Sequence, residues 1–103
     1  MLEKKVLENG MVRVTFHLSE QIWADHIALV GEFNNWDRHS HELHQTHHDH
    51  SWHISLDLES NRSYRFRYLV DGEEWMDDDH ADGYEANPFE GFDSVVSTYE
   101  EAP

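Results

Sequence analysis

The heptapeptide GEFNNWD, residues 31–37, directly follows an apolar run at Ile27–Val30. An aliphatic run that ends at a glycine and continues into two asparagines predicts a strand leading into a tight polar loop. Asn34 and Asn35 tolerate left-handed backbone conformations and can bond to the nearby main chain, so the loop can be stiff without proline. The loop carries one large ring, Trp36, which either caps the core or is held out from the sheet edge.

Alternating apolar and polar residues extend this prediction to both sides of the loop. In residues 12–18 every second side chain is Val, Phe or Leu, and this period of two is typical of a half-buried strand. The segments predicted as strands are 11–18, 27–30, 41–46, 52–58, 64–70, 73–76 and 94–99. No window has helical spacing, so about seven short strands predict an all-β, immunoglobulin-like sandwich.

Two of the connections carry predictions of their own. Trp23, between the first two strands, is expected to cover the edge of the core, because interior tryptophans mostly serve packing. Residues 77–90 show no periodicity and contain Gly83 and Pro88. They are therefore predicted to form a long loop, and long loops often carry function.

Length and composition set the domain plan and exclude several kinds of partner. The 103-residue chain has the size of one domain, with residues 1–10 expected to be an N-terminal extension, 11–99 the sandwich and 100–103 a tail. The absence of cysteine excludes thiol catalysis and disulfides. The charged N-terminus lacks the apolar segment of a signal peptide or membrane span, so a cytoplasmic location is expected. The 22 acidic against 7 basic residues disfavour nucleic acid and anionic membranes as partners.

Four sequence motifs follow one another along the chain. They are LVGEFNNW at 29–36, YRFRYLVDG at 64–72, Trp75, and a closing segment with NPF at 87–89 and DSVV at 93–96. In this order they resemble a family 48 carbohydrate-binding module, the early-set sandwich that precedes the catalytic barrel of isoamylases and glycogen-branching enzymes. The same module is the glycogen-binding domain of the AMP-activated kinase beta subunit. The resemblance implies an early-set, immunoglobulin-like fold.

The resemblance also implies a sugar site. Its members hold glycogen with two tryptophans and a basic residue, at the positions of Trp36, Trp75 and Arg67. This chain has arginine in place of the kinase domain's lysine, and one extra residue between Gly72 and Trp75. Asp93 stands where the glycogen-binding members have an asparagine.

The chemistry of these residues agrees with that site. A pyranose ring gains by laying its C–H face on an indole, and its hydroxyls need donors and acceptors at the rim. Trp36 and Trp75 supply two such faces, and Arg67 supplies N–H donors in a fixed fork. The expected further partners of the hydroxyls are Asn34, Asn35 and Asp93. Two simpler alternatives stay open, an ion pair of Arg67 with a surface carboxylate and a cross-strand aromatic contact of Trp75.

Histidines gather in the middle of the chain and offer a rival metal site. Seven of the ten fall between residues 39 and 53, and imidazole is a common transition-metal ligand. His39 with His41, or His48 with His50, would share one face of an extended segment. Because cysteine is absent and the spacing is irregular, no metal or other cofactor is expected, and binding in the test tube is interpreted as adventitious.

The acidic segment 77–85 offers a second alternative to the sugar site, because it resembles a calcium-binding loop. Asp78 and Asp82 occupy the first and fifth ligand places of such a loop, but His80 stands at the third place. Phe89 stands where a bidentate glutamate belongs. A solvated acidic loop is therefore the expected structure.

Catalysis is not expected. Glycoside hydrolysis needs two carboxylates held across a cleft, and in the resembling enzymes these belong to a separate barrel domain. The sequence thus predicts a stand-alone, cytoplasmic, non-enzymatic module that binds α-glucan such as glycogen, starch or maltodextrin. The alternative is an early-set domain that docks on a glycan-active or regulatory protein without binding sugar.

Overall fold

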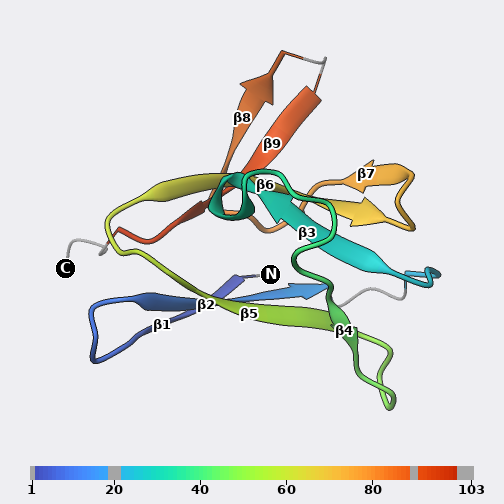
Figure 1. The fold of residues 1–103 in the computed structure, drawn as a ribbon, viewed down its shortest axis with the longest axis horizontal. Coiled ribbons are helices and arrows are strands. Elements are labelled where there is room, and N and C mark those ends of the chain that lie inside the picture. The colour runs from blue at the N-terminus through green and yellow to red at the C-terminus, as the bar shows by residue number, and fades with distance from the viewer. Residues whose placement is uncertain (1, 19–21, 89–90, 100–103) are drawn as a thin grey trace.

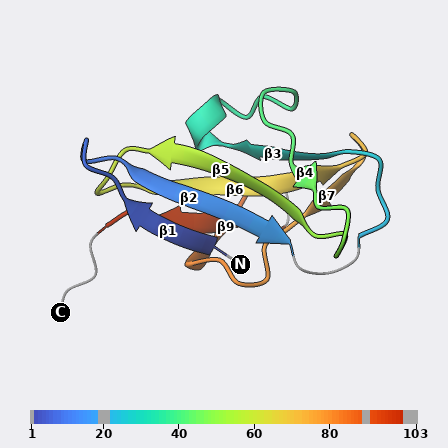
Figure 2. The same ribbon diagram turned by 90° about the horizontal axis from the view of Figure 1, so that it is seen from below.

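A computed structural model describes residues 2–18, 22–88 and 91–99, which form two antiparallel sheets packed face to face (Figure 1). The strands of sheet A, in spatial order, are β1 (Leu2–Val6), β2 (Val12–Leu18), β5 (Trp52–Leu58) and β4 (His44–Gln45). Those of sheet B are β3 (Ile27–Gly31), β6 (Ser63–Val70), β9 (Gly91–Ser97) and β8 (Gly83–Asn87), and β7 (Glu74–Met76) also pairs with β6. Figure 2 shows sheet A lying across sheet B. The predicted all-β sandwich of the immunoglobulin-like, early-set type is confirmed.

The chain between β3 and β5 crosses from one sheet to the other. Residues 41–43 pair with β3, through a bridge between Glu42 and Ala28 and a hydrogen bond of 2.8 Å from the Leu43 N–H to the Ile27 carbonyl. The next residues form β4, which pairs with β5 in sheet A. The strand predicted at 41–46 is therefore only two residues long, and the predicted hairpin with 52–58 is present.

Two edge strands differ from the sequence prediction. Residues 77–90 were predicted as one loop, and this is wrong because Gly83–Asn87 forms β8 and pairs with β9. Leu2–Val6, within the expected N-terminal extension, forms β1 and pairs with β2. Neither strand has a buried face, so neither shows the alternation on which strand prediction depends. No helix among the described residues is long and apolar enough to cross a lipid bilayer.

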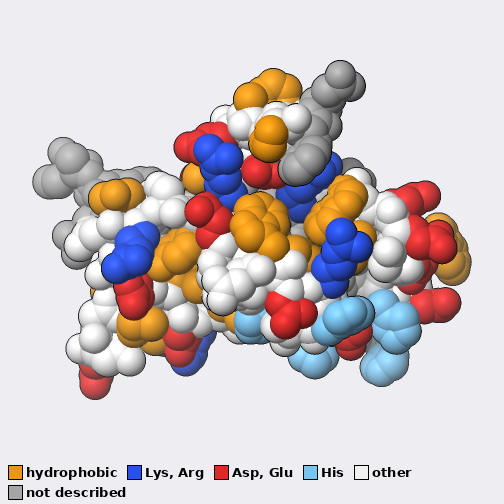
Figure 3. Space-filling view, turned by 45° about the horizontal axis from the view of Figure 1, so that its top comes forward, with side chains coloured by type: hydrophobic (Ala, Val, Ile, Leu, Met, Phe, Trp, Pro, Cys, Tyr) orange, Lys and Arg blue, Asp and Glu red, His pale blue; other side chains and the backbone are white. Residues whose placement is uncertain are grey.

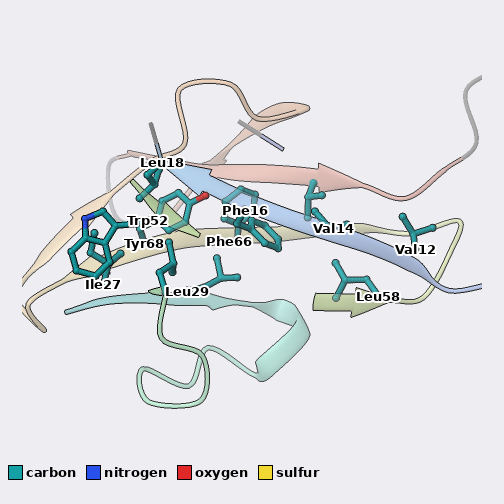
Figure 4. Packing of buried hydrophobic residues seen from close by; sticks show 12 residues of the cluster. Val12, Val14, Phe16, Leu18, Ile27, Leu29, Trp52, Leu58, Phe66 and Tyr68 are labelled. Atoms are coloured by element: carbon teal, nitrogen blue, oxygen red, sulfur yellow. The ribbon is translucent and has the colours of Figure 1, made fainter. Parts of the chain in front are cut away.

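The core lies between the two sheets (Figure 4). Every second side chain of β2 points into the core, and aromatic side chains of β6 enter it from sheet B. Phe66 lies edge-on to Phe16 across the sandwich, with ring centroids 5.1 Å apart, and edge-on to Tyr68 at 5.7 Å. The largest fully buried apolar side chains are Tyr68, Phe16, Phe66, Ile27, Leu29, Val14, Val30 and Val96.

Trp23 does not cover the core, and the prediction for it is wrong. Its side chain is 93% exposed. Its neighbours Ile22 and Ala24 pack against the core instead, so the alternation of this segment turns the indole outward. The tryptophan of the core is Trp52, which is 4% exposed and lies opposite Leu18.

A polar cluster is buried beneath the acidic segment. The Tyr68 hydroxyl donates to Asp78 Oδ2 at 2.7 Å, and the Asp78 N–H donates to Ser94 Oγ at 2.9 Å. The His80 N–H donates to the other Asp78 oxygen at 2.8 Å. Burial and the neighbouring Asp78 carboxylate raise the pKa of Tyr68 well above its ordinary range. These bonds anchor the chain after β7 to the middle of sheet B.

The outer face of sheet A carries a ladder of polar cross-strand pairs. Arg13 Nε lies 2.8 Å from Asp57 Oδ1 and its Nη2 lies 3.2 Å from Oδ2, while the Thr15 and Ser55 hydroxyls are 2.8 Å apart. The hydrogen bond from Arg13 lowers the pKa of Asp57. As the pH falls, the Asp57 carboxylate is therefore protonated in the unfolded chain at a higher pH than in the folded protein.

We expect the stability that Asp57 supplies to be present at neutral pH and lost in acid. Its contribution is full above the usual carboxyl range and disappears as the pH falls through the lower folded pKa. Urea unfolding of the natural protein and Asp57→Asn, at about pH 7 and about pH 2, measures the difference. Arg13→Gln should lower the unfolding free energy at neutral pH by the same amount, and adding it to Asp57→Asn should cause no further loss. A difference that persists unchanged at acid pH would contradict this assignment.

Candidate functional site

The loop that follows β3 is braced by the side chain of Asn34. Residues Glu32–Asn34 form a single 3-10 turn, η1. The amide oxygen of Asn34 accepts the Gly31 N–H at 3.1 Å, and its nitrogen donates to the Leu29 carbonyl at 2.9 Å. The same nitrogen lies 3.0 Å from His41 Nδ1. Asn34 thus ties the loop to the strand that precedes it and to the segment that follows it.

The loop then presents Trp36 on a left-handed backbone. Asn35 and Trp36 have φ angles of 56° and 59°, a region that costs a bulky residue on the order of 1 kcal/mol or more. Hydrogen bonds from the Trp36 N–H to the Gly31 carbonyl at 2.8 Å and from the Asp37 N–H to the Asn34 carbonyl at 3.1 Å hold this conformation. The Trp36 side chain remains 40% exposed. The loop is tight without proline, as predicted, and its indole does not close the core.

Beside this indole, the outer face of sheet B is hollowed into a pocket of about 610 Å³. Its lining comes from the Trp36 loop, β6, β7, and the β8–β9 hairpin. Figure 3 shows hydrophobic side chains in the middle of this face with basic side chains beside them. The lining residues are Trp36, Arg38, Arg65, Arg67, Trp75, Asn87, Pro88 and Asp93.

Trp75 projects from β7 into the pocket and lies among arginines. Its side chain is 38% exposed. The guanidinium carbons of Arg38 and Arg67 lie 5.3 and 5.6 Å from the centroid of its ring, distances at which a cation is attracted to an indole. The residue opposite Trp75 on β6 is Leu69, so its cross-strand partner is aliphatic rather than aromatic.

Arg67 combines an ion pair with a place in the pocket. Its Nε donates to Asp77 Oδ1 at 3.0 Å, which is the carboxylate pairing that the sequence left open. The pairing fixes the guanidinium while the side chain still lines the pocket. The ion pair and the pocket position are therefore compatible.

Asp93 lies at the opposite wall and is 7% exposed. It accepts a hydrogen bond of 3.2 Å from Asn87 Nδ2, and one oxygen lies 4.0 Å from Arg65 Nη1. Arg65 is also paired with Glu85 on β8. A network of alternating charge therefore joins β6, β8 and β9 along this wall.

The pocket gathers most, but not all, of the residues expected at the site. Trp36, Arg67, Trp75 and Asp93 line it. Asn34 and Asn35 are not among the lining residues, because the Asn34 amide is used within the loop and Asn35 forms its left-handed turn.

Sequence reasoning missed three polar residues of the lining. They are Arg38, Arg65 and Asn87. Arg65 lies two residues before Arg67 and so faces the same side of β6, a signal that was present in the alternation. Asn87 lies in the closing NPF motif, of which Phe89 is outside the described residues. Nothing in the local sequence points to Arg38.

The histidines do not form a metal centre in the part of the chain that the structure describes. There, no group of three or more His, Asp or Glu side chains is placed to hold a metal ion. His39 and His41 lie in the loop after Trp36, whereas His48 and His50 lie between β4 and β5. His41 is instead a neighbour of the Asn34 amide.

The acidic residues of 77–85 are engaged separately rather than around one ion. Asp77 pairs with Arg67, and Asp78 binds the Tyr68 hydroxyl. Asp82 lies 2.6 Å from Lys4 Nζ and accepts the Ser97 N–H at 2.7 Å. These contacts link β6, β9 and β1 to the segment, so the described carboxylates serve the fold.

Comparison with known proteins places the whole arrangement in a family. The sequence model described as carbohydrate-binding module 48 (isoamylase N-terminal domain) matches residues 8–88, which is well over half of the chain and includes Trp36, Arg67 and Trp75. No curated protein matches the chain. The match agrees with the four motifs and with the sandwich. The chain therefore belongs to the carbohydrate-binding module 48 family.

Proposed function

We propose that the pocket on sheet B binds α-glucan, such as glycogen, starch or maltodextrin, without cleaving it. The observation that carries this proposal is the meeting of two half-exposed indoles, Trp36 and Trp75, with arginine donors in one open pocket. Pyranose rings lay their C–H faces on indoles and bond through hydroxyls at the edge. This lining offers both kinds of contact within one sugar-sized space.

Two of the three arginines of the pocket are held in place by carboxylates before any ligand arrives. Arg67 is fixed by Asp77, and Arg65 by Glu85. Each guanidinium has five N–H donors, so the fixed pairs leave donors for sugar hydroxyls. Groups that are already ordered lose less conformational entropy on binding. The pairing therefore supports affinity for a neutral ligand.

Two further points support α-glucan and binding rather than hydrolysis. The family is named for isoamylase, and the members that this chain resembles act on or bind glycogen and starch. Among the lining residues Asp93 is a single carboxylate, whereas glycoside hydrolysis uses a pair of them across the scissile bond. The proposed role is therefore to attach the protein to glucan chains rather than to cleave them.

Titration with maltoheptaose, followed by tryptophan fluorescence, tests the proposal. Saturable quenching is expected in the natural protein, and Trp36→Ala should weaken binding by about tenfold or more, a loss of about 1.4 kcal/mol. Thermal unfolding of Trp36→Ala should stay cooperative, because Trp36 lies outside the core cluster. Trp23→Ala is the matched control, since this 93% exposed indole does not line the pocket.

Three results would count against the proposal. Absence of any fluorescence response up to millimolar sugar would contradict glucan binding. Equal weakening by Trp23→Ala would place the contact elsewhere. Loss of cooperative unfolding in Trp36→Ala would show that this indole stabilises the fold instead.

A further inference from the structure

Arginine is concentrated at the pocket of an otherwise acidic protein. The chain has a formal net charge of −15, with only 7 lysines and arginines. Three of these basic residues, Arg38, Arg65 and Arg67, line this one pocket. The few basic residues of the chain are therefore concentrated at this one site, and how each of them is paired decides what charge the pocket offers a ligand.

The three arginines differ in how their charge is compensated. Arg65 is paired with Glu85 and Arg67 with Asp77. Arg38 has no ion pair with a carboxylate among the described residues, although the chain holds 22 acidic side chains. Arg38 is thus the arginine of the pocket lining that holds no ion pair among the described residues, although Glu42 and Asp71 line a neighbouring hollow with it.

Arg38 is also placed where it can reach a sugar held on the tryptophans. It comes two residues after Trp36, and its guanidinium carbon lies 5.3 Å from the centroid of the Trp75 ring. The cation therefore lies over one indole and close in the chain to the other. A ring stacked in this pocket would bring its substituents to the N–H fork of Arg38.

We propose that the pocket prefers glucan that carries phosphomonoester groups, and that Arg38 binds the phosphate. This inference rests on the proposed glucan binding and names the substrate class of the same site. A guanidinium matches phosphate oxygens with two parallel hydrogen bonds, and charge-assisted bonds are roughly twice as strong as neutral ones. A neutral hydroxyl makes no such use of an unpaired charge.

The charge of the whole chain explains why the phosphate has to be attached to glucan. A net charge of −15 repels free anions. At physiological salt this repulsion is screened beyond about 8 Å, whereas contacts inside the pocket are screened much less. Stacking on Trp36 and Trp75 brings the ester within that range. Inorganic phosphate and glucose 6-phosphate, which lack a chain of stacked rings, should bind weakly.

The test compares two maltodextrins of equal length, one neutral and one bearing phosphomonoesters, by calorimetric titration of the natural protein and Arg38→Gln. The natural protein should bind the phosphorylated chain about five- to tenfold more tightly, and higher salt should reduce this ratio. Arg38→Gln should bring the ratio close to one. Arg13→Gln, which removes an arginine from the other sheet, should keep the ratio of the natural protein.

The outcomes separate this inference from the function on which it rests. Equal binding of both maltodextrins by the natural protein would overturn the phosphate preference and leave glucan binding standing. A preference that survives in Arg38→Gln would overturn the role of Arg38. Competition by inorganic phosphate or glucose 6-phosphate as strong as that of the phosphorylated chain would replace glucan by a small phosphate ligand. Failure of both maltodextrins to bind would overturn the glucan proposal as well.

Discussion

Replacing Gly31 by alanine should destabilise the protein by about 2–3 kcal/mol. Gly31 has extended backbone angles, so the cost comes from space rather than from conformation. A Cβ at this position would lie 2.5 Å from the Arg65 carbonyl oxygen and 2.9 Å from Phe66 Cβ. Both atoms belong to β6, which pairs with β3 at this point. The added methyl group would therefore push the two strands apart at the end of their ladder.

The same substitution should weaken sugar binding, because Gly31 is also the base of the Trp36 loop. Its carbonyl accepts the Trp36 N–H at 2.8 Å, and its N–H donates to the Asn34 side chain at 3.1 Å. Urea unfolding measures the stability, and maltoheptaose titration measures the binding.

Gly83→Ala is the matched control for Gly31→Ala. A Cβ at Gly83 would meet only Val95 Cβ, at 4.0 Å, which is an ordinary contact distance. We expect a change in unfolding free energy within about 0.5 kcal/mol for this control. Equal stability of the two variants would show that β3 and β6 separate at Gly31 without cost, and would contradict the steric argument.

Tyr68→Phe should destabilise the protein by about 2 kcal/mol, because it removes a hydrogen bond to a buried carboxylate. Asp78 is fully buried and receives the Tyr68 hydroxyl at 2.7 Å. Phenylalanine keeps the ring packing on Phe66 but leaves that oxygen without this donor. Chemical denaturation near neutral pH measures the loss.

Tyr64→Phe, on the same strand, is the control for this prediction. The Tyr64 hydroxyl donates to the Glu59 carbonyl at 3.3 Å in an exposed position, so its removal should cost less than about 1 kcal/mol. The pH dependence gives a second check. Burial raises the pKa of Tyr68, so the Tyr68 hydroxyl loses its proton at a lower pH in the unfolded chain than in the folded protein. Stability should therefore fall as the pH rises above about 10. A Tyr68→Phe variant that matches Tyr64→Phe in stability would contradict a role for the buried bond.

The sequence was most informative where a strand has one buried and one exposed face. Strands β2 and β5 keep that alternation, and in β6 the buried Phe66 and Tyr68 alternate with the half-buried Arg65 and Arg67. The predicted segments at 11–18, 52–58 and 64–70 coincide with these strands to within one residue. The edge strands β1 and β8 are exposed along most of their length. They are held by main-chain pairing, which leaves no mark in the order of side chains. This is why Gly83–Asn87 was mistaken for a loop.

The candidate site shows the same division between local and long-range information. Asn34 and Asn35 correctly predicted a tight loop bonded to its own main chain, but the amide of Asn34 is used in making it. Arg38 was missed because its place over Trp75 depends on how the loop folds back across sheet B. The tryptophans and Arg67 came from the family resemblance, and their contact with sugar remains a prediction.

The pocket and the polar ladder lie on opposite outer faces of the sandwich. Trp36, Arg67 and Trp75 belong to sheet B and its loop, whereas Thr15 and Ser55 pair on sheet A. A cysteine introduced at Ser55 would be the single thiol of the chain. The protein could then be attached to a sensor or resin in one orientation, with the pocket turned away from the support.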